Sequence, residues 1–241
     1  MTENSGFAFA ASAPRAAWLA PSLALCLIFA APALAQVDIK TPDAGKAETG
    51  MQRLFVEGDR IVFAGDVPRE DDDSIDEPDV EEFLALARAH PEIRKLELTS
   101  YGGYVPDALD FAHAVAEMGF ETLVPRICSS ACTLVFIAGV RRTLEPGARL
   151  GFHGSSWGRS SMMAFYEDAR EDNGWLDEMA FAAWVYQEAM RDQRKEIAFM
   201  AEHGIDIGFT LRTLAVAPDD MWYPARRELI EAGVLEGPEG Q

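Results

Sequence analysis

Short apolar segments alternate along this chain with longer segments that carry apolar residues at helical spacing. Residues 54–56 and 61–63 flank Gly58-Asp59, a pattern that predicts a β-hairpin. Further strands are predicted over residues 95–99, 121–125, 149–152 and 221–223. Helices are predicted over residues 78–89, 106–118, 130–140, 175–203 and 226–232. Strands that alternate with helices in this way predict an α/β fold built of βαβ units.

One region departs from this alternation. Residues 154–173 begin with Gly and Ser and predict a loop or a lid. The long helix that follows ends at Gly204, because glycine commonly terminates helices. We therefore expect residues 154–204 to form a lid loop and helical insertion, an additional helical segment near the C-terminus of a single α/β domain spanning residues 51–241.

The first 35 residues have the pattern of a secretory signal peptide. Arg15 precedes an apolar run over residues 16–31, and Ala33-Leu34-Ala35 then supplies a small-x-small cleavage site. Cleavage after Ala35 leaves about 200 residues, enough for one domain, with residues 36–50 as a flexible lead-in. We expect a periplasmic or secreted protein. The alternative is an uncleaved N-terminal anchor in the inner membrane, for which the apolar run is marginal in length.

The chain is strongly acidic, with a net charge of −19. This charge disfavours binding to nucleic acid through phosphate neutralisation. Nine carboxylates fall within residues 70–82. A calcium loop is one interpretation, but the glycine and the ligand spacing of such a loop are missing. A solvated loop that leads into a helix N-terminus is the interpretation that the pattern favours.

The candidate chemistry centres on Ser130 and His153. Ser130 lies on a small-residue elbow that opens an apolar helix, and we prefer it to Ser129 because it directly precedes the helix. His153 follows an apolar strand, and Gly151 and Gly154 enclose the pair Phe152-His153, whereas the other histidines fall at helix ends or within a helix. Histidine is the usual base that activates a serine hydroxyl near neutral pH. A helix cap is the structural alternative for Ser130.

Two further features belong to this hypothesis. Gly102-Gly103 follows a predicted strand, and forms either a simple turn or a bare backbone whose N–H groups face a substrate. No phosphate-loop lysine accompanies it, so we expect no nucleotide cofactor. An orienting carboxylate completes a Ser-His-acid triad. Spacing alone leaves Asp206, Asp219 and Asp220 as alternatives.

Cys128 and Cys132 flank Ser130 at a spacing of four residues. In an oxidising compartment this spacing allows a disulfide across the elbow, provided that the backbone bends suitably. The alternative is a pair of small apolar residues packed in the core. Two cysteines without a neighbouring histidine make a poor metal site, so we expect no metal.

Taken together, these motifs resemble the Clp peptidase within the ClpP/crotonase superfamily. The shared order is strand, Gly-Gly, helix, then Ser-x-x-x-Leu-x-x-x-Ala-Gly, then an apolar strand that ends in His. The chain is more similar to exported ClpP-like proteins of bacteria, which carry Cys-x-Ser-Ala-Cys and Gly-Phe-His, here residues 128–132 and 151–153. The resemblance covers residues 52–153 well and residues 219–235 weakly. It implies a fold of stacked ββα units.

The resemblance also implies roles for individual residues. Ser130 would be the nucleophile and His153 its general base. The acid of the family lies shortly before the last strand and helix, which favours Asp219 or Asp220 over Asp206, and we choose Asp219.

The same resemblance implies an oxyanion hole and shows where the chain departs from the family. Backbone N–H groups of Gly102 or Gly103 and of Ala131 would form the hole. Tyr101 stands where the Clp peptidase has proline, and Cys132 where it has glycine. Residues 154–204 do not match the helix that builds the Clp rings, so a homo-oligomer remains open.

The function that these observations favour is an exported serine hydrolase, a ClpP-like peptidase that acts on peptides or proteins through an acyl-enzyme. No ATP-driven unfoldase partner is expected, since an exported chain has no ATP supply. The first alternative is a crotonase-like thioesterase or esterase. The second is a non-catalytic periplasmic binding or assembly module on the same fold.

Overall fold

The computed structural model describes residues 52–68 and 74–237, and all of them belong to one compact unit. The predicted signal peptide, the alternative anchor and the lead-in lie outside the described residues, as does part of the acidic loop. Within the described part of the chain, no helix combines the length and the apolar character that crossing a membrane requires.

The central sheet has five strands in the order β1-β2-β3-β4-β6. The hairpin predicted at Gly58-Asp59 is present, with β1 (Leu54–Glu57) antiparallel to β2 (Arg60–Ala64). Strands β3 (Lys95–Thr99), β4 (Glu121–Val124) and β6 (Arg142–Leu144) continue the sheet in parallel. The α/β fold is therefore as predicted, although β6 was not expected from the sequence.

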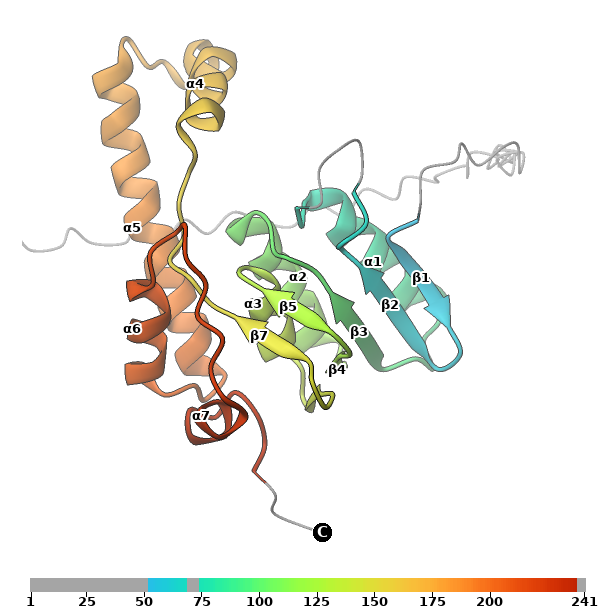
Figure 1. The fold of residues 1–241 in the computed structure, drawn as a ribbon. Helices are drawn as coiled ribbons and strands as arrows, with labels where there is room; N and C mark the ends of the chain where they lie inside the picture. The colour runs from blue at the N-terminus through green and yellow to red at the C-terminus, as the bar shows by residue number, and fades with distance from the viewer. Residues whose placement is uncertain (1–51, 69–73, 238–241) are drawn as a thin grey trace, which may run out of the picture. The chain divides into compact units, whose positions relative to one another are not determined.

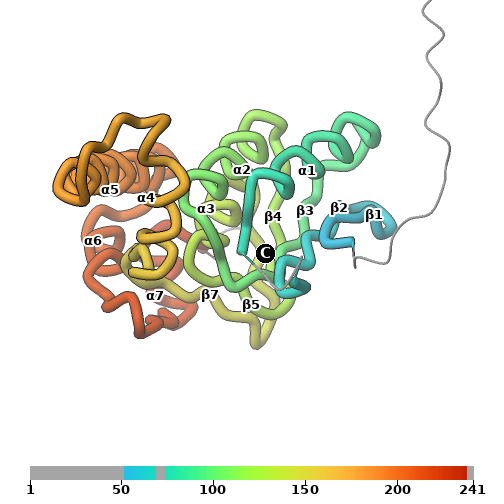
Figure 2. The backbone as a smooth tube through the Cα atoms, turned by 90° about the horizontal axis from the view of Figure 1, so that it is seen from above, coloured from blue at the N-terminus to red at the C-terminus, as the bar shows by residue number. Residues whose placement is uncertain are grey.

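Three helices pack against this sheet and against one another (Figures 1 and 2). They are α1 (Glu77–Ala89), α2 (Val105–Glu117) and α3 (Cys132–Ile137). The core between them is aromatic: Phe111 lies 5.6 Å from Phe63 and 4.8 Å from Phe83, measured between ring centroids. Burial of such rings supplies much of the driving force for folding, so these contacts anchor the helices on the sheet.

A buried ion pair ties α1 to the start of the sheet. Nη2 of Arg53 lies 3.4 Å from Oδ2 of Asp79, and the two side chains are 1% and 0% exposed. The Asp79 carboxylate also accepts a hydrogen bond from the backbone N–H of Asp76, which caps the helix in return. The pair thus joins a helix cap to the strand layer, and removing either charge would leave the other buried.

A second, two-stranded sheet carries the elbow. In it β5 (Ile127–Ser129) runs parallel to β7 (Arg149–Gly151). A bridge between Ser100 and Cys128 places the carboxyl end of β3 beside β5. Segments that lie far apart in the sequence, after β3, β5 and β7, therefore meet at one edge.

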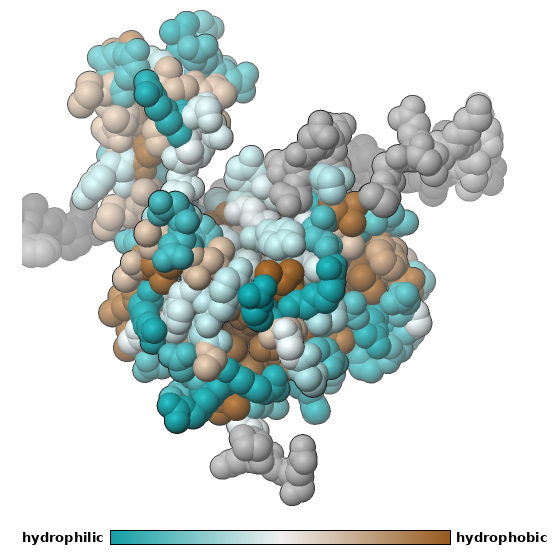
Figure 3. All heavy atoms as spheres, viewed as in Figure 1, coloured by the Kyte–Doolittle hydropathy of each residue, from teal (hydrophilic) through white to brown (hydrophobic). Residues whose placement is uncertain are grey.

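The C-terminal part is helical (Figure 1). The helices are α4 (Arg159–Asn173), α5 (Glu178–Glu202), α6 (Ile207–Ala215) and α7 (Arg226–Glu231). Figure 3 shows that hydrophilic residues, in teal, cover much of the face on view.

The expectation of a loop at residues 154–173 was wrong for most of that segment, because α4 occupies residues 159–173. Ring contacts give the physical reason. Phe165 stacks at 5.8 Å on Trp184 of α5, and Tyr166 lies 5.2 Å from Phe181. These contacts stabilise α4, whose polar composition gives no clear signal for a helix. The insertion is thus a pair of helices rather than a loop followed by a helix.

Candidate active site

Ser130 lies on a tight elbow between β5 and α3. Its φ of 53° falls in the left-handed region, and it is the only non-glycine residue with positive φ among residues 52–68 and 74–237. Its N–H donates to the carbonyl of Gly151 at 2.8 Å. A side chain in this region carries a conformational cost that persists only where surrounding contacts hold it, and such strain is common at nucleophile elbows. The helix expected from residue 130 begins at Cys132.

His153 is brought to Ser130 by the strand that precedes it. Nε2 of His153 lies 2.7 Å from Oγ of Ser130, within hydrogen-bond reach. Phe152 exchanges two backbone hydrogen bonds with Trp222, at 2.8 and 2.9 Å, which fix the chain just before the histidine. The two residues that the sequence singled out as nucleophile and base are therefore in contact. Ser129, by contrast, is buried, and its hydroxyl has no hydrogen-bond partner in the described structure.

No carboxylate orients the imidazole in the described part of the chain. Nδ1 of His153 is buried and makes no hydrogen bond there. Asp219 is exposed on the turn before Met221, so the geometry does not support it as the orienting acid. Asp206 caps α6 by accepting the N–H of Phe209 at 2.8 Å, and Asp220 accepts the N–H of Met221 at 2.8 Å. The carboxylates of the two alternatives thus accept hydrogen bonds from N–H groups of the neighbouring backbone.

The Gly pair lies directly against the elbow. A Cβ on Gly102 would meet Cβ of Ser130 at 2.7 Å, and a Cβ on Gly103 would meet the backbone nitrogen of Ile75 at 2.0 Å. Both glycines have positive φ, 117° and 155°. The absence of side chains therefore lets two backbone segments approach closely beside Ser130, which is more than a simple turn requires.

Of the three predicted oxyanion donors, the structure leaves two available. The N–H of Gly102 donates to Oγ of Ser100 at 3.1 Å, so the expectation that it could serve a substrate is corrected. The N–H groups of Gly103 and Ala131 have no hydrogen-bond acceptor within the described residues. These two backbone donors, on either side of Ser130, are the ones able to face a developing oxyanion.

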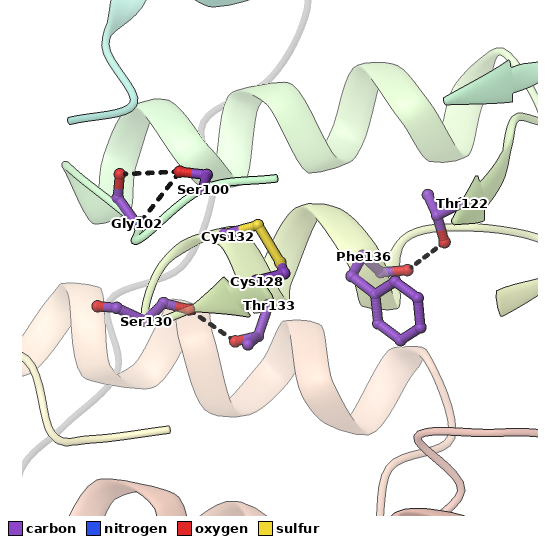
Figure 4. Close-up of a disulfide and its surroundings, with 8 residues drawn as sticks. All are labelled: Ser100, Gly102, Thr122, Cys128, Ser130, Cys132, Thr133 and Phe136. Atoms are coloured by element: carbon purple, nitrogen blue, oxygen red, sulfur yellow. Dashed lines mark hydrogen bonds between the residues drawn. A yellow bond between two sulfur atoms is a disulfide. The ribbon is translucent and has the colours of Figure 1, made fainter. Parts of the chain in front are cut away.

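A disulfide spans the elbow (Figure 4). Cys128, in β5, is bonded to Cys132, at the start of α3, with Cα atoms 5.4 Å apart. Both cysteines are fully buried. Of the two interpretations of this pair, the structure has the covalent one. The bond encloses Ser130 within a short ring of backbone and thereby restricts the conformations open to it.

A small cleft, with a volume of about 20 Å³, lies over the Ser130–His153 pair. It is walled by the elbow, by the chain after β7 and by α5 and α6. One ionisable side chain besides His153 lines it, that of Glu196 on α5. Burial raises the pKa of the Glu196 carboxyl from 4.5 to about 7, and a hydrogen bond from Ser155 offsets part of the rise.

Sequence reasoning missed Glu196. A single glutamate within a long helix of mixed composition is typical of a solvated surface, and only the packing of α5 against the elbow places this one in the cleft. Its one detectable signal is Met200, four residues later, which lines the same cleft and marks the buried side of α5.

Comparisons with known proteins find similarity among solved structures only. No protein-family model matches the chain, and no curated protein matches it. A mutant of ClpP1 from Listeria monocytogenes is similar over 67% of this chain and 84% of its own, with 14% identity and a TM-score of 0.43. The fold and the site define an α/β protein with a serine–histidine pair at the edge of its sheets. The roles of Ser130 and His153 rest on the geometry described above.

Proposed function

We propose that this chain is a serine hydrolase, and more narrowly a ClpP-like peptidase, in which Ser130 forms an acyl-enzyme. The observation that carries the proposal is the 2.7 Å contact between Oγ of Ser130 and Nε2 of His153. Three further features support it: the positive φ of Ser130, the two N–H groups beside it and the cleft above it. A serine that only caps a helix needs none of these.

The chemistry follows from this geometry. Nε2 of His153 takes the hydroxyl proton as Oγ of Ser130 attacks the substrate carbonyl carbon. The N–H groups of Gly103 and Ala131 stabilise the oxygen that becomes negative. The same imidazole then protonates the leaving group, and the acyl chain stays on Oγ. A water molecule, deprotonated by His153, attacks the ester and releases the product and the free serine.

The described structure has no carboxylate that orients His153, and this lowers the rate of hydrolysis that we expect. Nε2 accepts a proton only when Nδ1 carries the ring hydrogen, and no acceptor within the described residues holds that hydrogen. Loss of the orienting acid in a full triad lowers kcat by about 10⁴-fold. We infer that the pair, as arranged here, turns over amides slowly and relies on packing around Phe152 to orient the ring.

This inference makes an ester or thioester hydrolase the second candidate. An alkoxide or thiolate leaves more readily than an amine, so it depends less on protonation by a well-oriented imidazole. We further propose export through the N-terminal segment, peptide or protein substrates, no nucleic-acid partner and no ATP-driven unfoldase. Assembly into a homo-oligomer stays a prediction.

The proposed function is tested by measuring the hydrolysis of two classes of substrate. Purified chain is incubated with a peptide library and with an acyl-ester library, beside Ser130→Ala. Cleavage of peptides that is lost in the variant supports the peptidase, and cleavage confined to esters selects the second candidate. Equal rates for the parent chain and Ser130→Ala in both libraries would contradict a hydrolase and favour a binding or assembly module.

A further inference from the structure

The carboxyl of Glu196 shares a cleft with the proposed nucleophile. Glu196 and Met200 come from adjacent turns of α5 and line the cleft together with Ser130. Apart from His153, the other side chains that line the cleft are uncharged. The half-buried carboxyl of Glu196 is thus the one acidic group among the side chains that line this cleft.

No cation of the described structure pairs with this carboxyl. Of the basic residues near it on α5, Lys195 pairs with Asp192 at 3.0 Å and Arg191 pairs with Glu188, while Arg194 is exposed and forms no ion pair with Glu196. The one hydrogen bond to Glu196 comes from Oγ of Ser155, at 3.5 Å, the long end of the range. Partial burial of a carboxylate without a strong partner costs free energy, unless another group supplies a positive charge or hydrogen-bond donors.

We propose that Glu196 forms a substrate subsite that binds a cationic amine or guanidinium beside the scissile bond. This inference rests on the proposed hydrolase function and adds the class of substrate to it. The group could be a lysine or arginine side chain or the free N-terminus of a peptide. A charge-assisted hydrogen bond to Glu196 would fix the substrate against the wall of α5, with its carbonyl facing Ser130.

The surroundings of the cleft favour the same charge. Burial and the neighbouring carboxylates of Asp110, Glu77 and Asp76, in that order, raise the pKa of Asp107 on α2. A bridge between Ile75 and Gly103 joins this acidic group to the Gly pair beside Ser130. Carboxylates therefore lie near the elbow on the side of α1 and α2 as well. Such a field attracts cations and repels anionic substrates.

The subsite is tested by binding, so that the result does not depend on turnover. Ser130→Ala and Ser130→Ala/Glu196→Gln are titrated with a fluorescent acetyl-Ala-Ala-Lys-Ala-Ala amide and with its norleucine analogue. We expect the lysine peptide to bind Ser130→Ala about tenfold more tightly than the analogue, and this preference to vanish in the double variant. Ser130→Ala/Glu202→Gln, changed at an exposed position of the same helix, should keep it.

Further arms separate the sources of the cation. A norleucine peptide with a free N-terminus, compared with its acetylated form, reports on the α-ammonium. Arginine and citrulline peptides report on the guanidinium. Equal affinity of Ser130→Ala for the cationic and neutral member of every pair would overturn the subsite. So would a preference that survives Glu196→Gln. If Ser130→Ala/Glu196→Gln fails to fold, Ser130→Ala/Glu196→Met, which removes the charge with a side chain of similar length, takes its place and should likewise lose the preference.

Measurements of hydrolysis and of binding distinguish a failure of the proposed subsite from a failure of the proposed hydrolase function. A chain that hydrolyses neutral substrates through Ser130 but shows no cation preference loses the subsite only. A chain that binds the lysine peptide through Glu196 without any hydrolysis loses the proposed function only. In hydrolysis, the preference should appear as a ratio of kcat/KM for lysine over norleucine that falls to about one in Glu196→Gln.

Discussion

Nε2 of His153 lies 2.7 Å from Oγ of Ser130, although the two residues are 23 positions apart in the sequence. The register of the small sheet explains the contact. Ser129 pairs with Gly151 in parallel strands, so the chains leave β5 and β7 at the same end and carry the next residues toward each other. The contact is therefore a consequence of strand pairing rather than of a flexible loop, and the site should be present before substrate binds.

Gly102→Ala should slow the reaction of Ser130. The added Cβ would lie 2.7 Å from Cβ of Ser130 and 2.9 Å from the carbonyl oxygen of Ser129, so the elbow must shift. We expect at least a tenfold loss of the rate at which Ser130 is acylated, since displacements of about 1 Å can cost about 100-fold. Gly147→Ala is the matched control, because Gly147 also has positive φ but no atom within 4 Å of its virtual Cβ. Similar losses in both variants would refute the steric explanation.

Removing the disulfide should loosen the elbow. Cys128→Ala/Cys132→Ala frees the short ring that holds Ser130 at positive φ, and we expect both acylation rate and stability to fall. The chain-entropy estimate for so short a ring is about 2 kcal/mol. Dithiothreitol, given at a concentration and time that reduce the buried bond, should slow acylation of the parent chain and leave the double variant unaffected. An acylation rate unchanged by reduction, with free thiols verified by mass, would speak against this role.

The pH dependence of stability should reflect Glu196. Its folded pKa, about 7, lies above the ordinary 4.5, so the folded chain binds more protons than the unfolded chain between these values. Stability then decreases as pH rises through this window. We expect the parent chain to lose on the order of 2 kcal/mol relative to Glu196→Gln between about pH 5 and pH 8, less any screening at this half-buried position. Urea unfolding at both pH values measures it, and parallel profiles would contradict it.

Arg53→Met should destabilise the fold strongly. It leaves the Asp79 carboxylate, which is 0% exposed, without its guanidinium partner. Loss of one member of a buried pair costs about 3–5 kcal/mol. Arg227→Met provides the control, because its pair with Glu231 is exposed on both sides and should cost less than about 1 kcal/mol. Equal midpoints of urea unfolding for the two variants would show that burial of the Arg53–Asp79 pair has no consequence.

Elements whose pattern is set locally were predicted well. The strand over residues 95–99 and the hairpin at Gly58-Asp59 follow from alternation and turn chemistry, and the structure has both. Strands β5 and β6, of three residues each, are too short to give a periodic signal, and pairing with distant neighbours forms them. Helix α4 depends on ring contacts with α5, which no local pattern contains.

In the candidate site, too, some residues have a local sequence signal and others are placed by tertiary packing. Ser130 could be predicted from the small-residue elbow that opens an apolar helix, and His153 from the apolar strand before it. The spacing of Cys128 and Cys132 left a disulfide and core packing as alternatives, and the structure has the disulfide. The acid could not be predicted, because the path of residues 217–221 depends on tertiary packing, and the structure leaves Asp219 exposed. Glu196 reaches the cleft because a helix distant in the sequence packs beside the elbow, so its position follows from the tertiary structure.

The most direct test of the account is covalent labelling of Ser130. Folded chain is treated with a small neutral fluorophosphonate, and the adduct is located by mass spectrometry of peptides. We expect one adduct on Ser130, absent in Ser130→Ala, slowed at least about 100-fold in His153→Ala, and unchanged in Ser129→Ala. No adduct on the folded parent chain, or equal labelling rates in the parent chain and His153→Ala, would contradict activation of Ser130 by His153.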